Sequence, residues 1–379
     1  MLAKCLAGTE EVLSRELREL GAMNITPVKR GVRFQGDMGF LYKANLWLRT
    51  ALRILMPVSE FKARNEEEIY RRLKQFPWEE HFGVDKTLVV KANVFAPHIR
   101  NSLFLAQRVK DAVADRFREK TGRRPSVNKE NPDIVIDVHV ARERVVVSLD
   151  SSGQSLHKRG YREETGRAPL SEVLAASILR LAGWDGLKHF VDPMCGSGTF
   201  LVEAALMAHN IPPGVFRENY AFKNWLNFDQ ELFQLIFDKA LEKEKNFHFS
   251  ITGFDRNSRA VLKSRHNLKK SLMNEQVNTE KLDFLALPPE RNFKTPGILV
   301  VNPPYGEKLE ANIPELYAGI GDSLKQHFPG YEAWVFTASM EGLKHIALKP
   351  SKKIPLKNGN LDCLLVQYEL YEGSRKTGS

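Results

Sequence analysis

The tetrapeptide Asn302-Pro303-Pro304-Tyr305 combines residue types that suit chemistry on an aromatic amine. The apolar run Ile298–Val301 precedes it and reads as a β-strand, which two prolines must end because proline cannot continue a central strand. The Asn302 side-chain oxygen and the Pro303 carbonyl can both accept hydrogen bonds from a planar exocyclic NH2 group, which turns its nitrogen lone pair towards an electrophile. Tyr305 can stack on the base that carries the amine. We therefore predict that these four residues form a catalytic site.

Methyl transfer from a sulfonium is the reaction that this set of residues can support. It is an in-line displacement with a thioether leaving group, so positioning supplies most of the rate and no strong base is required. The same tetrapeptide fits any exocyclic amine, which leaves guanine N2 and adenine N6 open as targets. Methylation at C5 of a pyrimidine is disfavoured because that reaction needs a cysteine nucleophile. A structural turn that contains Asn-Pro-Pro is the alternative without a function.

The segment His189–Ala208, HFVDPMCGSGTFLVEAALMA, reads as a buried strand, a glycine turn and a helix. The glycines allow the backbone to turn sharply and to approach a ligand, and the helix end beyond them offers N–H groups to an anionic group. The spacing is not GxGxxG and no Gly-Lys-Ser/Thr follows, which disfavours dinucleotide binding and ATP hydrolysis. A bare tight turn is the alternative. The predicted cofactor-binding residues of this turn are Asp192, Pro193, Met194, Cys195, Gly196, Ser197 and Gly198.

Two further acidic residues come after predicted strands. Asp255 ends the strand Ser250–Asp255, and an acid at the end of a parallel strand faces the ligand crevice, where it can accept hydrogen bonds from both ribose hydroxyls of a nucleoside cofactor. Asp283 offers a carboxylate to an adenine amino group, and Phe284 offers a ring to cover the base. Taken alone, Asp255 could be an ordinary helix N-cap. We also expect Asn302 to lie beside the cofactor.

Helical and strand-like segments alternate along the chain, which predicts an α/β fold with small α+β units at its start. Helices are expected from Thr9, from Asp37 to about Leu48 and at Asn65–Phe76, and strands at Leu2–Gly8, Ile54–Phe61, Thr87–Phe95, Ile134–Val140 and Val145–Leu149. The amphipathic helix Ser102–Thr121 leads into a basic loop with Arg123 and Arg124. A helix, a basic loop and paired strands suit docking on RNA by shape, although a charged helix face is more often merely solvated.

The formal net charge of +10 is concentrated in the first part of the chain. Residues 1–165 contain 30 Lys and Arg against 22 Asp and Glu, whereas the remainder contains 26 against 24. This distribution indicates that a polyanion docks on the N-terminal part. A basic surface that serves only solubility is the alternative.

Two stretches each allow two interpretations. Residues 151–169 are rich in Ser, Gly and Arg and have the composition of a linker. In the second interpretation, a cluster lines a phosphate or cofactor site, namely Lys158, Arg159, Tyr161, Arg162 and Arg167. Of these, Lys158, Arg159 and Arg162 are predicted to bind RNA. The aromatic stretch Pro212–Lys245 is either local core or a wall of the active site.

The composition predicts a cytoplasmic protein. Hydrophobic residues make up 42% and charged residues 27%, as in ordinary globular proteins. No apolar run approaches the roughly 18 residues that a membrane span needs, and no signal peptide opens the chain. The three cysteines, Cys5, Cys195 and Cys363, are widely separated, so we expect neither disulfides nor a metal site. We interpret Cys195 as a packing residue.

The ordered motifs resemble those of class I S-adenosylmethionine-dependent amino-methyltransferases. The motifs are DPMCGSGT at 192–199, Asp255, Asp283-Phe284 and NPPYG at 302–306. With HKRGYR at 157–162, RAPL at 167–170 and the N-terminal α+β region, nearly the whole chain is similar to the THUMP-domain RNA methyltransferases, in particular to those that methylate guanine N2 of bacterial 23S ribosomal RNA. The resemblance implies a ferredoxin-like domain at 1–56, an RNA-binding THUMP domain at 57–155 and a Rossmann-like methyltransferase domain at 156–379.

The resemblance also assigns roles and partners. The turn Asp192–Gly198 would hold the methionine part of S-adenosylmethionine, Asp255 the ribose, Asp283 and Phe284 the adenine, and the segment 302–305 the guanine amine, with S-adenosylhomocysteine as the product. The expected partner is RNA, namely 23S ribosomal RNA or a ribosome assembly intermediate, and we expect a monomer without a metal. Some relatives carry a second methyltransferase domain, which we expect to be absent or on another polypeptide. A tRNA guanine-N2 or adenine-N6 methyltransferase and a non-enzymatic RNA-binding assembly factor are the competing hypotheses.

The charge distribution predicts a steep dependence of RNA affinity on salt. Each phosphate that Lys or Arg neutralises releases condensed counterions, so the affinity of the full chain for ribosomal RNA should fall about tenfold or more between roughly 50 and 200 mM salt. Filter binding over a salt series measures the slope. An affinity that does not change with salt would contradict docking of a polyanion.

Overall fold

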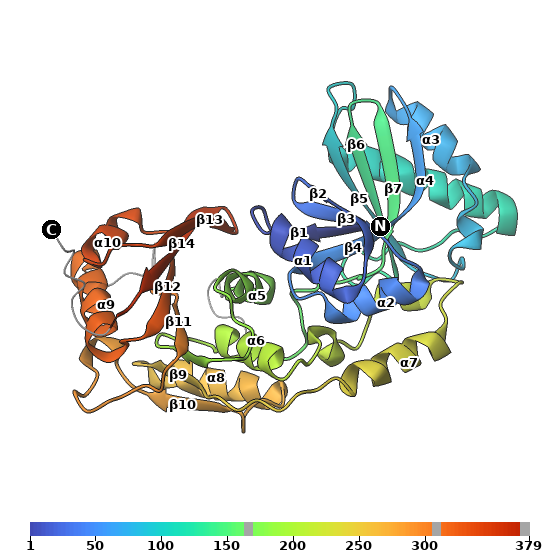
Figure 1. Ribbon diagram of the computed structural model, residues 1–379. Coiled ribbons are helices and arrows are strands. Elements are labelled where there is room, and N and C mark those ends of the chain that lie inside the picture. The colour runs from blue at the N-terminus through green and yellow to red at the C-terminus, as the bar shows by residue number, and fades with distance from the viewer. Residues whose placement is uncertain (163–169, 305–311, 372–379) are drawn as a thin grey trace. The chain divides into compact units, whose positions relative to one another are not determined.

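The computed structural model describes residues 1–162, 170–304 and 312–371 (Figure 1). The chain forms two compact units. Unit 1 consists of Met1–Cys5, Ser14–Lys158 and Arg217–Asp238, and unit 2 consists of Leu6–Leu13, Arg159–Phe216 and Lys239–Ser379. The motifs of the turn, of the strand-end acids and of Asn302 therefore all belong to unit 2.

Unit 1 contains a seven-stranded sheet in the order β2-β3-β1-β4-β7-β6-β5. Its strands are β1 (Leu2–Cys5), β2 (Met23–Val28), β3 (Gly31–Gln35), β4 (Ala51–Lys62), β5 (Leu88–Phe95), β6 (Ile134–Ala141) and β7 (Arg144–Asp150). The long strand β4 joins the two halves, because its first part pairs with β1 and its second part with β7, with a register shift between Pro57 and Ser59. β5 pairs with β6 in parallel, and the other described pairs of this sheet are antiparallel.

The helices of the N-terminal region begin and end where the sequence indicates. They are α1 (Glu10–Leu20), α2 (Met38–Trp47), α3 (Glu66–Gln75), the short η1 (Trp78–Glu80) and α4 (Ser102–Thr121). Asp37, Asn65 and Asn101 each cap a helix by accepting a hydrogen bond from the backbone N–H three residues later. Gly122 ends α4 in the left-handed conformation, at φ 70°. Local capping chemistry thus determined these boundaries.

Most of the aromatic stretch after residue 212 belongs to unit 1, namely Arg217–Asp238, which contain η3 (Ala221–Asn224) and most of α7 (Gln230–Leu241). The short η2 (Pro213–Phe216) belongs to unit 2. The Tyr42 ring on α2 contacts Phe222, Phe228 and Phe233, with centroid distances of 4.7 to 5.9 Å. The Tyr42 hydroxyl also accepts a hydrogen bond from the Asp229 backbone at 3.0 Å. Of the two interpretations of this stretch, the structure supports local core, and the core is that of unit 1.

Unit 2 contains a seven-stranded sheet in the order β10-β9-β8-β11-β12-β14-β13. Its strands are β8 (His189–Asp192), β9 (Ile251–Asp255), β10 (Val277–Lys281), β11 (Gly297–Val301), β12 (Tyr331–Thr337), β13 (Lys352–Asn358) and β14 (Leu361–Glu369). The first five strands in chain order run parallel, and β14 runs antiparallel to both β12 and β13. All five residues of β11 are buried, as an apolar run without alternation predicts for a central strand.

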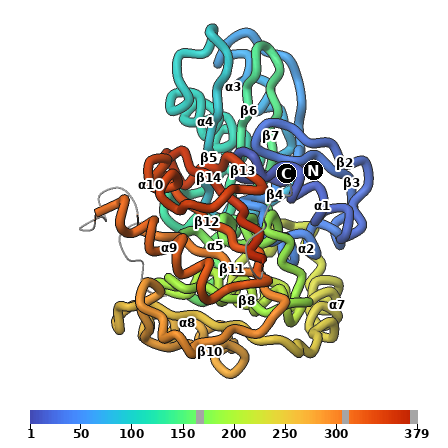
Figure 2. Tube along the Cα trace, turned by 60° about the vertical axis from the view of Figure 1, so that its left-hand side comes forward, coloured from blue at the N-terminus to red at the C-terminus, as the bar shows by residue number. Residues whose placement is uncertain are grey.

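Helices cover both faces of this sheet (Figure 2). They are α5 (Glu172–Leu181), α6 (Thr199–Ala208), α8 (Ser258–Lys270), the short η4 (Phe284–Ala286), α9 (Ile313–His327) and α10 (Met340–His345). Ile298 and Val300 pack with α5 and α6, whereas Leu299 and Val301 pack with α9. The result is a three-layer α/β unit, as expected for a Rossmann-like domain. Among the residues that the structure describes, no helix combines the length and the hydropathy that crossing a membrane requires.

The aromatic core of unit 1 generates a stability prediction. Phe222 is fully buried among other rings, and truncation of a buried phenylalanine costs about 3–5 kcal/mol. Phe222→Ala should therefore lower the urea midpoint of unit 1 strongly, as followed by circular dichroism. Leu226 is 60% exposed, so Leu226→Ala should change stability by less than about 0.5 kcal/mol. Equal effects of the two changes would show that the stretch does not form this core.

Candidate active site

The predicted site residues come together at the point where the strand order of unit 2 reverses. β8 lies between β9 and β11 in the sheet, and ligands of open α/β sheets bind outside the carboxyl ends of the strands at such a point. Asp192 is the last residue of β8, Asp255 is the last residue of β9, and Asn302 directly follows β11. The parallel register therefore brings three motifs, separated by up to 110 residues of sequence, to one edge of the sheet.

Hydrogen bonds hold the glycine turn to the neighbouring strand and helix. The Cys195 N–H donates to the Phe254 carbonyl at 3.0 Å, and the Gly196 N–H donates to Asp255 Oδ2, also at 3.0 Å. On the other side, Asn267 Nδ2 of α8 donates to the Ser197 carbonyl at 2.9 Å. The turn is thus fixed from both sides by groups that lie more than 50 residues later in the chain.

The two glycines of the turn, Gly196 and Gly198, differ in the space around their Cα atoms. Both have a positive φ, 54° at Gly196 and 78° at Gly198. A Cβ atom on Gly198 would lie 2.4 Å from Ser264 Oγ, so this glycine permits the close packing of α6 on α8. A Cβ on Gly196 would meet no described atom within 4 Å. Gly196 therefore borders open space, as a cofactor-binding turn requires, and the sequence did not distinguish it from Gly198.

The two strand-end acids differ in burial and in their partners. Asp192 is buried, and burial raises the pKa of its carboxyl well above the usual range, with a further contribution from nearby Asp255. Asp192 Oδ1 accepts from the Met194 N–H at 3.3 Å. Asp255 is partly exposed and accepts from the backbone N–H groups of Gly196 and Asn257. Because a carboxylate offers about four acceptor positions, Asp255 can still receive the two hydroxyls of a ribose.

Asp283 and Phe284 follow β10 and form the first residues of a short helix. The half-buried Asp283 caps η4 by accepting from the Leu285 N–H at 3.0 Å. Phe284 is only 1% exposed and packs against Phe254 and Phe328. This burial corrects the expectation that the Phe284 ring covers an adenine, because the ring is already enclosed in the core. The neighbouring Asp283 keeps a position from which it could meet an amino group.

Asn302 presents a buried hydrogen-bond acceptor directly after β11. Its Oδ1 atom is buried, and no described residue donates a hydrogen bond to it. A buried acceptor without a donor costs about 1–3 kcal/mol, which an amino group of a ligand would recover. Pro303 is buried and Pro304 is partly exposed beside it. Tyr305, the predicted stacking residue, lies outside the described residues, as does Gly306.

Cys195 occupies the turn as a packing residue. Its side chain is buried in the core below the turn, and burial raises the pKa of its thiol far above the usual value. A thiol that stays protonated is a poor nucleophile. In the described ranges, no group of three or more His, Cys, Asp and Glu side chains is arranged to hold a metal ion.

The predicted RNA-contacting residues fall into two groups. Arg123, Arg124 and Lys158 are exposed and available to phosphate. Arg159 is only 2% exposed, and its Nε lies 3.3 Å from Glu203 Oε1 of α6. Because its guanidinium is enclosed and paired, this position does not favour direct contact with RNA, and Arg159 instead anchors the start of unit 2.

Arg162 has a similar structural environment. Its side chain is 9% exposed and ion-paired with Glu172 of α5, and it donates to Thr199 Oγ1 at 2.5 Å. Thr199 is the first residue of α6, directly after the glycine turn. Arg162 thus ties its segment to α5 and to the start of α6. Arg167, a further residue of the predicted cluster, lies outside the described residues. Sequence reasoning missed Glu203 and Glu172, because acids on apolar helices gave no sign of their buried partners.

The strand order, the antiparallel seventh strand and the motifs at the switch point define a class I methyltransferase domain. The sheet of unit 2 has five parallel strands followed by an antiparallel pair, and the turn, the acid and the Asn-Pro-Pro segment lie at its carboxyl edge. Methyltransferases of this class take the methyl group from S-adenosylmethionine.

The chain belongs to a family of RNA methyltransferases with this catalytic domain. The profile described as RMKL-like, methyltransferase domain, matches residues 159–367. A THUMP domain profile matches residues 63–150, and the profile of the RlmL ferredoxin-like domain matches residues 1–55. The predicted fold class, an α/β methyltransferase domain preceded by an α+β ferredoxin-like and THUMP region, is confirmed.

Curated relatives support the same family. The Synechocystis protein slr0064, which its name assigns provisionally to the RNA methyltransferases, is 39% identical over 96% of this chain and 95% of its own. The ribosomal RNA large subunit methyltransferase K/L of Syntrophotalea carbinolica is 40% identical over 96% of this chain and 53% of its own. The chain therefore spans about half the length of the K/L relatives. Among solved structures, SMU.472 in complex with SAH matches with a TM-score of 0.86 and 31% identity over 98% of both chains.

The acid at the end of β9 generates a binding prediction. Asp255→Ala removes the acceptors proposed for the ribose, and hydrogen bonds to a charged group contribute about 1.5–3 kcal/mol each. Its affinity for S-adenosylhomocysteine should therefore fall at least about tenfold in calorimetry. The exposed Asp362 of β14 provides a matched control, and Asp362→Ala should bind normally. Unchanged affinity of Asp255→Ala would place the cofactor elsewhere.

Proposed function

We propose that this protein transfers a methyl group from S-adenosylmethionine to the exocyclic N2 amine of a guanine in RNA, with 23S ribosomal RNA as the substrate. The observation that carries the proposal is the buried, unsatisfied Oδ1 of Asn302 beside the switch point. This atom needs a donor that the described residues do not supply, and an exocyclic amine is such a donor. The location expected for a protein that acts on ribosomal RNA is the cytoplasm.

The residues of the cofactor site fit the three parts of S-adenosylmethionine. Gly196 leaves open space beside the turn Asp192–Gly198, where the methionine part would lie. Asp255 retains free acceptor positions for the ribose hydroxyls. Asp283 would accept a hydrogen bond from the adenine amino group. The buried Phe284 anchors the neighbouring backbone in the core. The cofactor supplies a methyl group on a positively charged sulfur.

The protein residues contribute orientation. The Asn302 amide oxygen and the Pro303 carbonyl would accept the two N–H bonds of the amine and so direct its lone pair. The prolines limit the backbone freedom of this segment, which lowers the entropy cost of holding the amine in line. The buried strand β11 provides a rigid support for both residues. The proton of the methylated amine can leave to water, so no basic side chain is needed at this position.

The choice of guanine N2 in 23S ribosomal RNA depends on relatives. The motifs resemble those of guanine-N2 methyltransferases, and the K/L relatives are named for the large ribosomal subunit. The same acceptors fit adenine N6, which is therefore the second candidate target. Mass mapping of modified nucleosides in ribosomal RNA from a deletion strain distinguishes the two targets. Loss of N2-methylguanosine supports the proposal, whereas loss of N6-methyladenosine would show that adenine N6 is the target.

The proposal predicts a selective loss of rate in Asn302→Ala. Asn302 holds the amine rather than the cofactor, so the fold and the affinity for S-adenosylhomocysteine should persist. By analogy with the loss of one preorganised hydrogen-bonding group, the methyl-transfer rate should fall about 10²- to 10³-fold. Single-turnover transfer of labelled methyl to unmodified ribosomal RNA measures this rate.

Asn278 of the edge strand β10 is exposed and provides a matched control. Asn278→Ala should retain the wild-type rate. Near-normal turnover by Asn302→Ala would show that the Asn-Pro-Pro segment is only a structural turn. Wild-type protein that binds RNA but transfers no methyl group would support a non-enzymatic assembly factor instead.

A further inference from the structure

Strand β5 forms one edge of the sheet of unit 1 and presents an unusual set of side chains. Its partner strand in the sheet is β6, its first residue Leu88 also forms an isolated bridge to Val127, and helix α4 packs on it. Side chains alternate between the two faces of a strand, and the set Lys91, Asn93 and Phe95 is exposed on one of them. Leu88, of the opposite set, is buried. Phe95, the last residue of β5, thus places an aromatic ring on the exposed face of this strand.

Phe95 is 69% exposed, which makes it one of the most exposed large apolar side chains of unit 1. Its ring lies 5.5 Å from the ring of His139 on β6, at an angle of 46°. His139 is also exposed. Two neighbouring rings at the surface present flat faces that the core does not use, and flat exposed rings are what unstacked bases need.

An open surface cavity of about 360 Å³ lies beside Phe95. Its lining includes Asn93, Phe95, Ile99, Arg100 and Asn101. Asn93 Nδ2 donates to Asp137, and Asn101 Oδ1 caps α4, so the Asn93 amide oxygen can accept from a base edge and the Asn101 NH2 group can donate to one. The exposed Arg100 can meet a phosphate. The Arg100 guanidinium also lies 5.8 Å from the Phe104 ring. The cavity therefore combines a ring, amides and a cation, whereas an apolar protein contact would use the ring alone.

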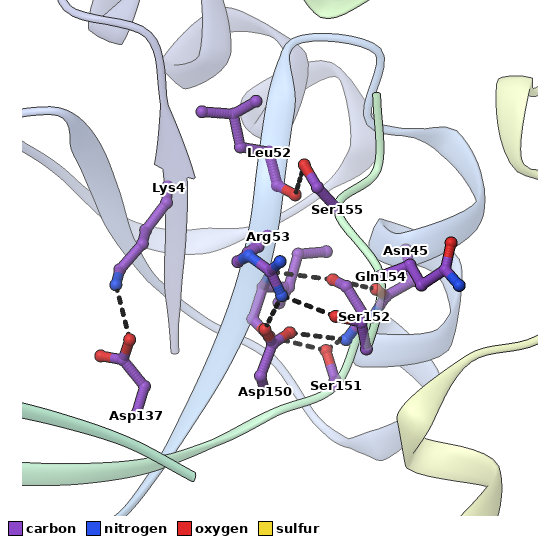
Figure 3. Close-up of polar contacts among 12 residues, drawn as sticks. Lys4, Asn45, Leu52, Arg53, Asp137, Asp150, Ser151, Ser152, Gln154 and Ser155 are labelled. Atoms are coloured by element: carbon purple, nitrogen blue, oxygen red, sulfur yellow. Dashed lines mark hydrogen bonds and ion pairs between the residues drawn. The ribbon is translucent and has the colours of Figure 1, made fainter. Parts of the chain in front are cut away.

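The charges around this face favour an anionic ligand. Lys4 pairs with Asp137 at 2.9 Å, and Arg53 pairs with Asp150, so the acids of the neighbouring strands are neutralised (Figure 3). Lys91 on β5 has no ion pair among the described residues, and it is exposed. A phosphate backbone that follows β5 would therefore meet Lys91 and Arg100, with no unpaired acid opposing it on β6.

We propose that Asn93, Phe95 and Arg100, together with His139, bind an unpaired nucleotide of the RNA substrate by stacking its base on the Phe95 ring. This site rests on the proposed function, which supplies RNA as the ligand. It adds the place on unit 1 where that RNA is bound. It is separate from Arg123 and Arg124, since α4 has 20 residues and so places its two ends about 30 Å apart. The nucleotide bound here is therefore not the one that the basic loop would contact.

Three changes at Phe95 test stacking in the full-length protein. The probe is a short, unstructured RNA oligonucleotide labelled with fluorescein, and anisotropy reports its affinity. Loss of one stacked base should weaken binding about 5- to 150-fold in Phe95→Ala. Phe95→Leu keeps an apolar side chain but lacks a π face, so it should be nearly as weak. Phe95→Tyr should restore binding.

Met23 is 63% exposed on β2, the opposite edge strand of the same sheet, and provides a matched control. Met23→Ala should bind the oligonucleotide normally. All variants should bind S-adenosylhomocysteine as the wild type does, which shows that unit 2 is intact. Wild-type circular dichroism and an unchanged urea midpoint would show that unit 1 is folded. Photo-crosslinking of the same oligonucleotide with 4-thiouridine should label a peptide that contains Phe95 or His139.

Two outcomes would overturn the site. Equal RNA affinity of Phe95→Ala and wild type would show that the ring is not used, and wild-type affinity of Phe95→Leu would assign it to apolar contact with a protein. Failure of the proposed function looks different: the wild type would transfer no methyl group to ribosomal RNA, while Phe95→Ala would still weaken binding of the oligonucleotide. Wild-type methylation with unchanged binding by Phe95→Ala rejects the site alone.

Discussion

The hydrogen bond from the Gly196 N–H to the Asp255 carboxylate holds the active-site edge together. It joins the end of β8 to the end of β9, and the Cys195 bond to the Phe254 carbonyl reinforces it. Without this link, a turn with two positive φ values would have many conformations, because glycine adopts them at little cost. With it, the open side of Gly196 and the free acceptor positions of Asp255 lie next to each other. A site for a long nucleoside cofactor needs this arrangement, since the cofactor must touch several strand ends at once.

Buried charges fix the segment that enters the catalytic unit. Arg159 pairs with Glu203, and Arg162 pairs with Glu172 while it donates to Thr199. Desolvation makes such pairs weak contributors to stability, yet removing one partner leaves an uncompensated charge and costs about 3–5 kcal/mol. The pairs therefore fix the position of residues 159–162 relative to helices α5 and α6. Since α6 begins at the glycine turn, these pairs also help to keep the turn in place.

The two units differ in which strands and side chains they leave exposed. The catalytic unit buries its central strand on both faces and brings a few polar groups to one edge of its sheet. Unit 1 instead leaves strand β5 at the edge of its sheet, with exposed cationic and aromatic side chains. A buried strand provides the rigidity that in-line transfer requires. An exposed edge provides the surface that a long anionic polymer can follow.

Local chemistry made much of this protein predictable. The prolines after Val301 end a strand, Asp37 and Asn65 cap helices, and the glycines of the turn mark a loop; each of these effects acts over a few residues, so it can be read from the chain. Burial could not be read in the same way, because it depends on surfaces that distant segments bring together. From the sequence, Arg159 is predicted to bind phosphate, but in the structure it is enclosed and paired with Glu203. Phe284 is predicted to cover the adenine, but its ring packs against Phe254 and Phe328. Phe95 resembled any apolar strand residue, and its exposure became visible only when β5 proved to be an edge strand. The sequence alone thus determined the elements, the motifs and the class of reaction, whereas the tertiary structure decided which charged and aromatic side chains remain available to a ligand, because that choice is made by long-range packing.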